Sequence, residues 1–242
     1  MALVGQAIHD RSAEDIVLQT ENLTKVFNSS AVKVVALRNV SITIRRGEFV
    51  TIVGPSGSGK STLLNLLGAL DRPTRGKVFI DGIDIFELND SDVARIRNRK
   101  IGFVFQSYNL ISRTTVLRNV EIPAIIAGMP KERRISRARK ILRLLEIEDK
   151  ANFKPTVLSG GQQQRVAIAR SLMNNPSIIL ADEPTGNLDT KTGQDVFNLL
   201  KELSHKYNRS IIMVTHNSEL ADLTDRSIYI RDGMVEKEVV NR

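Results

Sequence analysis

Residues 54–61, GPSGSGKS, have the composition and spacing of a phosphate-binding loop. They fit the pattern G-x-x-x-x-G-K-S/T, in which glycines let backbone N–H groups turn inward on a phosphate. In such a loop Lys60 would reach the β- and γ-phosphates, and the Ser61 hydroxyl would hold Mg²⁺. A strand pattern precedes the stretch and a helical pattern follows it, which favours a phosphate loop over an ordinary surface turn.

Two adjacent acids, Asp182 and Glu183, end the apolar run IILADE. Ligands bind at the carboxyl ends of parallel strands, and neighbouring strand residues face opposite ways, so different roles are expected for the two acids. Asp182 would support Mg²⁺ through a water molecule, and Glu183 would orient or deprotonate an attacking water. Alone, the pair would be an ordinary strand end before Pro184; the phosphate loop upstream favours the catalytic interpretation.

Two other polar residues also follow predicted strands. His216 comes after the run IIMVT, at the same expected sheet edge as Asp182. Such a histidine is more often structural, but its place favours a hydrogen bond to the γ-phosphate. Gln106 follows GFVF, and it is either a surface glutamine or a Mg²⁺ ligand that responds to the γ-phosphate.

A second glycine-rich turn, SGGQ at residues 159–162, precedes another helical pattern. Ser159 and Gln162 have the spacing of a capping box. Capping does not explain Gly160 and Gly161, because glycine weakens a first helical turn by about 1 kcal/mol relative to alanine. Paired glycines favour close approach of a ligand, so the turn is predicted to be a second phosphate contact.

Strand and helix patterns alternate around these residues, as a parallel α/β unit requires. A strand at residues 47–54 leads into the phosphate loop, and a helix at residues 60–70 follows it. The apolar face of that helix is expected to contain Leu63, Leu66, Leu67 and Leu70. Further strand patterns cover residues 16–27, 34–44, 76–82, 177–183 and 210–216, with a turn near 28–30 and a closing hairpin turned at Asp232 and Gly233.

Residues 91–158 differ because their pattern is mainly helical. One helix is predicted from the apolar spacing of Ile135, Ala138, Ile141, Leu142 and Leu145. A helical insert in an α/β chain indicates a subdomain. No internal repeat is visible, so a single nucleotide unit is expected.

The composition, with 41% hydrophobic and 26% charged residues, is typical of a folded globular protein. The absence of cysteine excludes disulfides and thiolate metal sites. No run approaches the roughly 18 apolar residues of a membrane span, and the first 15 residues make a poor signal peptide, which fits the cytoplasm. The net charge of +8 would attract nucleic acid, anionic lipid or nucleotides; the basic clusters RIRNRK and KERRISRARK are first interpreted as solvated helix faces.

Together and in this order, the motifs resemble those of the ATP-binding cassette (ABC) ATPases. GPSGSGKST resembles the Walker A loop, FVFQ the Q-loop, LSGGQQQR the family signature, IILADE Walker B, GNLD the D-loop and VTH the switch histidine. The resemblance implies an α/β fold: a P-loop NTPase (RecA-like) core with a mainly parallel sheet, an N-terminal antiparallel β subdomain and an inserted helical subdomain. A flexible extension (1–15) would precede one domain (16–242), with its core at about 16–90 and 163–242 and its helical subdomain at about 91–162.

The resemblance also implies hydrolysis of ATP, with Mg²⁺, by a head-to-tail homodimer around two ATP molecules. Glu183, His216, Gln106 and Lys60 would be catalytic. The Mg²⁺ ligands would be Ser61, Gln106 and Asp182. The nucleotide-binding residues would be Phe27, Gly54, Pro55, Ser56, Gly57, Ser58, Gly59, Lys60, Ser61, Thr62, Ser159, Gly160, Gly161, Gln162 and Asp189.

In the expected dimer, some of these residues would act at the ATP site of the other protomer. Ser159 and Gly161 would contact the ATP of the partner, and Asp189 would couple the two sites. Phe27 would stack on adenine, where the family more often has tyrosine. Gln106 and the helical insert would face a membrane permease, although Ser112 and Arg113 replace the proline and apolar residue common in relatives.

The residues of several motifs resemble those of the subgroup that serves MacB-, LolD- and FtsE-type systems. This implies the ATPase subunit of a transporter, peripheral on the inner face of the membrane and touching it only through a separate permease. A regulator that signals through a membrane partner without transport is a second interpretation. A nucleic-acid ATPase is a third, but the chain lacks the tandem cassettes, coiled coils or zinc modules of such proteins, so no nucleic acid partner is expected.

Overall fold

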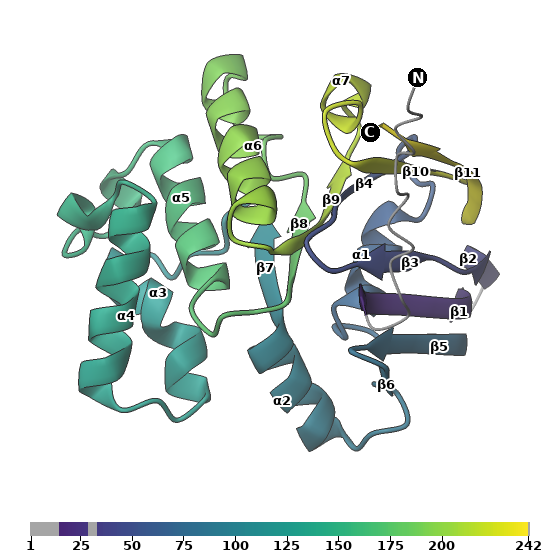
Figure 1. The fold of residues 1–242 in the computed structure, drawn as a ribbon, viewed down its shortest axis with the longest axis horizontal. Helices are drawn as coiled ribbons and strands as arrows, with labels where there is room; N and C mark the ends of the chain where they lie inside the picture. The colour runs from purple at the N-terminus through teal and green to yellow at the C-terminus, as the bar shows by residue number, and fades with distance from the viewer. Residues whose placement is uncertain (1–14, 29–32, 242) are drawn as a thin grey trace, which may run out of the picture.

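The computed structural model describes residues 15–28 and 33–241. The extension predicted at residues 1–15 lies outside this part of the chain except for Asp15, and most of the turn predicted near residues 28–30 also lies outside it. Figure 1 shows a central sheet flanked by helices, with a second sheet on one side and a helical lobe on the other. This arrangement confirms the predicted α/β class with an antiparallel N-terminal sheet.

The N-terminal sheet is antiparallel throughout, in the order β2-β1-β5-β6 with β3 also paired to β1. One expectation was wrong here, since residues 34–44 form two strands. β2 and β3 both pair with β1, β2 with its second half and β3 with its first half. Between them, the Thr20 hydroxyl replaces the backbone pairing: it donates to Val40 O and accepts from Ile42 N, both at 3.0 Å. The strands are β1 (Ile16–Asn28), β2 (Lys33–Val40), β3 (Thr43–Arg45), β5 (Arg75–Ile80) and β6 (Ile83–Asp84).

The central sheet has the order β11-β10-β4-β9-β8-β7, and all its pairs are parallel except β10 with β11. The β10–β11 hairpin turns at Asp232 and Gly233, as predicted, with φ values of 50° and 77°. The edge strand β7 lies within the range predicted for the helical subdomain, so the central sheet extends into that range. The strands are β4 (Phe49–Val53), β7 (Ile101–Phe105), β8 (Ile178–Asp182), β9 (Ser210–Thr215), β10 (Arg226–Arg231) and β11 (Met234–Val240).

Both faces of the central sheet are covered, because its strands are apolar on both sides. Along β8, Ile179 and Ala181 pack into the core formed with the helical lobe, whereas Ile178 and Leu180 pack toward α1 and the antiparallel sheet. Buried strands of this kind leave their carboxyl ends as the place where polar residues collect. The helices are α1 (Lys60–Leu67), α2 (Asp90–Lys100), α3 (Val116–Ile126), α4 (Lys131–Leu144), α5 (Gly160–Ser171), α6 (Thr190–His205) and α7 (Ser218–Ala221), with short 3₁₀ turns η2 (Glu148–Lys150) and η3 (Pro155–Val157).

Helix α1 is shorter than predicted. It ends at Leu67, Gly68 N donates to Leu64 O, and Ala69 then adopts a φ of 53°. Leu70 therefore lies beyond the helix and is 48% exposed, which corrects its placement on the apolar face. Within residues 15–28 and 33–241, none of the helices has the length and apolar character that crossing a membrane requires.

Candidate active site

Three neighbouring strands position the site. In the sheet, β9 lies between β4 and β8, and all three run parallel, so their carboxyl ends share one edge. The phosphate loop follows β4, the acidic pair ends β8, and His216 follows β9. Residues more than 150 positions apart in the chain are thereby collected in one place, as the strand patterns predict.

The phosphate loop closes onto the start of α1. Gly59 is the N-cap with a φ of 104°, and no side chain caps the first N–H groups of the helix. A Cβ at Gly59 would lie 2.5 Å from Ala36 O, whereas a Cβ at Gly57, whose φ is 78°, would meet nothing within 4 Å. The free N–H groups of α1 fit a bound anion, because a helix N-terminus carries partial positive charge.

Lys60 is held inside the loop. Its ammonium group donates to Gly54 O at 2.8 Å and to Pro55 O at 2.7 Å, and the residue is buried. The Ser58 hydroxyl oxygen is also buried and has no hydrogen-bond partner among the described residues. A fixed cation beside unpaired donors is the chemistry that a polyphosphate chain needs.

A cavity of about 430 Å³ unites the loop with the ends of the other two strands. It contains most of the loop and α1 residues predicted to touch ATP, together with Glu183 and His216. The residues that line it are Val34, Val35, Ala36, Ser56, Gly57, Gly59, Lys60, Ser61, Thr62, Glu183 and His216.

The two acids differ in environment, as their alternation in the sequence predicts. Burial, followed by the charge of Glu183, raises the pKa of Asp182 above its ordinary value. The Ser61 hydroxyl lies 3.5 Å from Asp182 Oδ1. Glu183 adopts a φ of 44°, and its Oε2 lies 2.8 Å from His216 Nδ1. Glu183 therefore faces the cavity with His216, while Asp182 lies beside Ser61.

Ser61 and Asp182 offer a hydroxyl and a carboxylate, the hard oxygen donors that Mg²⁺ prefers. Mg²⁺ commonly takes only one or two protein ligands besides phosphates and water, so the pair fits this ion. In the part of the chain that the structure describes, no cluster of three or more His, Asp or Glu forms a separate metal site. Gln106 is not brought to the pair: its amide donates to Asn187 Oδ1 at 3.2 Å, and it does not line the cavity.

Phe27 lies on the antiparallel sheet and is 44% exposed. It pairs across the strands with Val34, which lines the cavity, so its ring belongs to the cavity face of β1 and β2. The Lys25 ammonium lies 4.9 Å from the ring centre. Phe27 itself does not line the cavity, and its contact with adenine stays a prediction.

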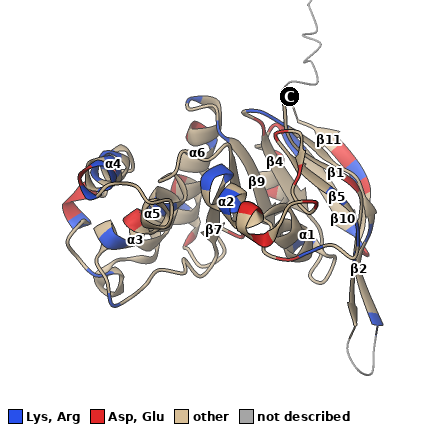
Figure 2. Cartoon of the chain, turned by 90° about the horizontal axis from the view of Figure 1, so that it is seen from below, with Lys and Arg blue, Asp and Glu red and all other residues tan. Residues whose placement is uncertain are grey.

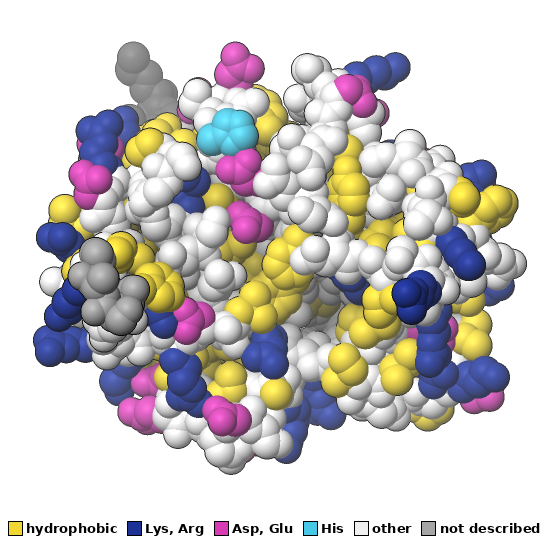
Figure 3. Space-filling model, turned by 180° about the vertical axis from the view of Figure 1, so that it is seen from behind, with side chains coloured by type: hydrophobic (Ala, Val, Ile, Leu, Met, Phe, Trp, Pro, Cys, Tyr) yellow, Lys and Arg dark blue, Asp and Glu magenta, His cyan; other side chains and the backbone are white. Residues whose placement is uncertain are grey.

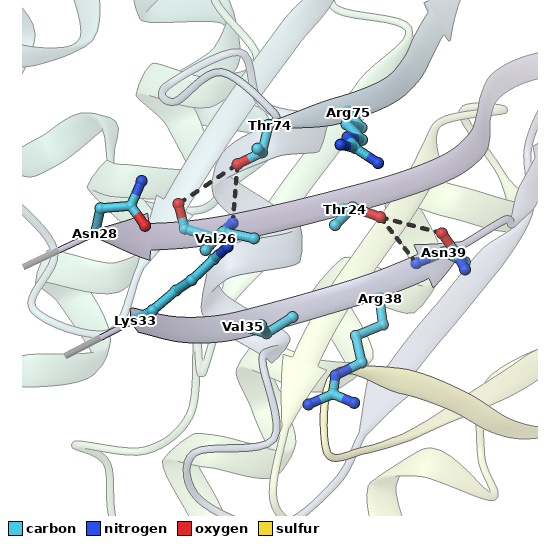
Figure 4. A pocket seen from close by; sticks show the side chains of 9 residues that line it. All are labelled: Thr24, Val26, Asn28, Lys33, Val35, Arg38, Asn39, Thr74 and Arg75. Carbon is cyan, nitrogen blue, oxygen red and sulfur yellow. Dashed lines mark hydrogen bonds between the residues drawn. The ribbon is translucent and has the colours of Figure 1, made fainter.

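A separate cavity of about 520 Å³ lies on the antiparallel sheet and contains none of the predicted site residues. Figure 4 shows Thr74 bridging to Val26 and Thr24 bridging to Asn39, which uses the polar groups of this hollow within the sheet itself. Its lining carries no carboxylate.

The signature turn at residues 159–162 stands apart from the phosphate cavity. Ser159 caps α5 in a capping box: its Oγ accepts from Gln162 N at 3.4 Å, and its N donates to Gln162 Oε1 at 3.0 Å. The glycines that follow have a packing reason that the sequence did not reveal. A Cβ at Gly160 would lie 2.9 Å from the Tyr108 hydroxyl, and a Cβ at Gly161 would lie 2.3 Å from Thr192 Cγ2.

Asp189 has a local role as the N-cap of α6. Its carboxylate accepts from Thr192 N at 3.0 Å. Hydrogen bonding to the Thr192 side chain, and then to this N–H, holds the pKa of Asp189 below its ordinary value. Thr192 is also the residue against which Gly161 packs. The signature turn and the segment that begins α6 therefore lie side by side within one chain.

Sequence reasoning missed Gln164. It is fully buried in α5, and its amide donates to Pro184 O at 2.7 Å, which ties the signature helix to the segment after Glu183. Its Oε1 has no hydrogen-bond partner among the described residues. The helical spacing could have identified it, since Gln164 lies on the same face as Ala167 and Ile168, which are both buried.

The comparisons with known proteins agree with this geometry. The family model described as ABC transporter matches residues 37–186. An uncharacterised ABC transporter ATP-binding protein of Thermotoga maritima is 53% identical and covers 91% of this chain and 94% of its own. The macrolide export ATP-binding/permease protein MacB of Brucella melitensis biotype 1 is 48% identical over 93% of this chain, but the match spans only 35% of that protein.

A solved structure of a related cassette contains a bound nucleotide. It is the dimeric structure of a post-hydrolysis state of the ATP-binding cassette MJ0796 bound to ADP and Pi. Its TM-score with this chain is 0.85 at 49% sequence identity, and the match covers 93% of this chain and 99% of that one. The likeness extends over both sheets and the helical lobe.

Proposed function

Because this chain belongs to the ABC transporter family and is its ATPase cassette, we propose that it dimerises head to tail around two ATP molecules and drives a separate membrane permease of the MacB, LolCDE or FtsX type. The observation that carries the proposal is the single cavity that joins the phosphate loop to Glu183 and His216. ATP hydrolysis there would be coupled to movement of the permease on the inner face of the membrane.

In this mechanism Lys60 and the N–H groups at the start of α1 bind the phosphates of ATP. Glu183 orients the attacking water and accepts its proton, and the contact of 2.8 Å with His216 fixes the carboxylate at the cavity wall. His216 also contacts the γ-phosphate. Ser61 and Asp182 would hold Mg²⁺, which would neutralise charge on the phosphates; Gln106 would join them only by giving up its hydrogen bond to Asn187.

The head-to-tail dimer is supported by the position of the signature turn, which does not line the phosphate cavity of its own chain. Ser159 is exposed and does not line the cavity, and neither do Gly160 and Gly161. The dimeric state of the MJ0796 cassette gives a precedent for a second chain in this family. In the proposal, Ser159 and Gly161 of one protomer contact the ATP bound by its partner.

A groove on the helical side supports a permease partner. It has a volume of about 500 Å³ and lies between α2, β7 and α3. Its apolar side chains include Leu70, Phe103, Ile111 and Ile126, and Ile126 is 70% exposed. On the face seen in Figure 3, hydrophobic side chains gather around a central hollow with Lys and Arg near them. Exposed apolar surface of this kind marks a protein or membrane interface.

The experiment that tests the dimer uses Glu183→Gln with saturating ATP. The variant should bind ATP, lose turnover by at least about a hundredfold, and accumulate as an ATP-bound dimer that light scattering detects. Retained ATP binding with only monomer in solution would contradict the head-to-tail proposal. Full turnover by this variant would contradict the role of Glu183. The dimer would then be tested by light scattering of the unmodified chain with ATP.

A further inference from the structure

The net positive charge of this protein comes from one segment. Residues 91–147 contain 13 Lys and Arg against 4 Asp and Glu, a net charge of +9. The rest of the chain contains 22 against 23, a net charge of −1, so this segment accounts for the whole excess of +8. Figure 2 shows Lys and Arg on α2 and α4, the two helices that carry most of these cations.

On α4 some cations pair with carboxylates and others do not. Arg134 and Arg143 pair with Glu121 and Glu148 at 2.8 and 2.7 Å. Three others, Arg133, Arg137 and Lys140, are spaced i, i+4 and i+7 and therefore form one stripe along the helix. None of these three pairs with a carboxylate of the described residues, since every described ion pair of α4 involves Arg134, Arg139 or Arg143.

The stripe continues onto α2. Arg99 and Arg137 both line a cavity of about 430 Å³, together with Asn174 and Asn175 and with no acidic residue. Arg137 is anchored there because its Nε donates to Met173 O at 2.6 Å. We name Arg99, Arg133, Arg137 and Lys140 the basic strip; Arg99 likewise has no described carboxylate partner.

The basic strip borders the apolar groove, since Asn174 lines both hollows. Cations beside exposed apolar side chains such as Ile126 suit the headgroup region of a bilayer, which receives both. Single-stranded nucleic acid is bound through stacking aromatic residues, and neither the strip nor its cavity contains one. The surroundings thus favour lipid over nucleic acid.

We propose that the basic strip binds the headgroups of anionic phospholipids, so that this ATPase contacts the membrane surface directly. This goes beyond the expectation that it reaches the membrane only through a permease, and it does not depend on a permease being present. The Asn175 amide would share the phosphate with Arg99 and Arg137, whereas the Asn174 amide already donates to Asn98 and Pro123 O. Binding would weaken as salt rises, because the contact is electrostatic.

The test is cosedimentation of the full chain with vesicles of equimolar phosphatidylglycerol and phosphatidylcholine, against vesicles of phosphatidylcholine alone. The variant Arg133→Gln/Lys140→Gln should bind the anionic vesicles roughly 25-fold more weakly, because each cation near an anionic surface contributes about fivefold. Arg99→Gln alone should bind about fivefold more weakly. The matched control, Lys206→Gln/Lys237→Gln, removes the same charge from exposed sites at the C-cap of α6 and on β11 and should bind almost as the parent does.

Basal ATPase activity and thermal unfolding should be the same in both double variants, because neither changes the phosphate cavity. Equal binding to the two kinds of vesicle would overturn the proposal, and so would equal losses in the strip and control variants. Tighter binding of duplex DNA than of anionic vesicles at the same salt, lost in the strip variant, would assign the strip to nucleic acid and also overturn it.

Discussion

Two glycine-rich turns precede helices in this molecule, and they treat the N–H groups of those helices differently. The turn before α1 has no side-chain cap, and Gly57 and Gly59 adopt left-handed conformations. The turn before α5 has a capping box formed by Ser159 and Gln162, and its glycines do not have positive φ values. One turn keeps its donors for a ligand, and the other has already satisfied part of its own.

The two turns also have glycine for different physical reasons. At Gly57 the conformation requires it, and the space around a Cβ is open. At Gly160 and Gly161 the packing requires it, because Tyr108 and Thr192 occupy the space. A glycine pair in a helical turn therefore does not by itself indicate a ligand. The ligand role of the signature turn depends on its exposure and on a partner protomer.

The largest effect is expected from Gly59→Ala, which breaks the first turn. A left-handed alanine costs about 1–2 kcal/mol, and its Cβ would also meet Ala36 O. We expect a loss of at least about 2 kcal/mol in the free energy of unfolding and a strong loss of ATP affinity. Urea unfolding and titration with an ATP analogue measure both. Gly57→Ala is the control, with the conformational cost alone; equal losses in the two variants would mean that the contact with Ala36 does not matter.

The next effect is on association. Ser159→Arg places a bulky cation at the exposed signature turn and should abolish the ATP-bound dimer of a Glu183→Gln background, while the monomer keeps its ATP affinity. Light scattering and nucleotide titration separate the two properties. Loss of ATP affinity in the monomer would mean that the turn acts on the site of its own chain.

A pH dependence distinguishes the acid beside the phosphate loop. The raised pKa of Asp182 means that the folded protein binds this proton more readily than the unfolded chain does. The ionised carboxylate therefore lowers stability at neutral pH. Asp182→Asn should raise the free energy of unfolding at pH 7, and the gain should shrink as pH falls through the raised pKa toward 3.8, its ordinary value. A gain that is equal at pH 4 and pH 7 would refute this explanation.

The smallest effect is expected from Ser159→Ala, which sharpens the account of the second turn. Loss of the capping hydroxyl should lower the free energy of unfolding by about 1 kcal/mol. Ser159→Asn can restore the cap and should recover most of that loss. Chemical unfolding of both variants checks the prediction; no loss in the alanine variant would show that the capping hydrogen bond of 3.4 Å contributes little.

Much of the fold could be predicted because β8 and β9 are continuous apolar runs with polar residues at their ends. The apolar strand before Gln106 was predicted, but the place of β7 beside β8 in the central sheet was not, since the rest of its segment has a mainly helical pattern. The early end of α1 was also missed, because the left-handed conformation of Ala69 leaves no mark in the apolar pattern that continues to Leu70.

The site could be predicted where strand order determines it. The geometry brings together Lys60, Ser61, Glu183 and His216, as their positions after strands indicate. The hydrogen bond of Gln106 to Asn187 could not be foreseen, because it joins segments 81 positions apart. Tyr108 and Thr192, the neighbours of the signature glycines, also come from other parts of the sequence, 52 positions before Gly160 and 31 positions after Gly161.

The place of β4 in the central sheet has a consequence for synthesis of the chain. Synthesis of β4 is complete at Val53, whereas both of its neighbours, β9 and β10, come from residues after Leu203. At about 5–20 residues per second, the strand that leads into the phosphate loop waits roughly ten to thirty seconds for the strands that flank it. The antiparallel sheet, by contrast, is complete by Asp84. On a ribosome the nucleotide cavity is therefore among the last parts of this protein to form.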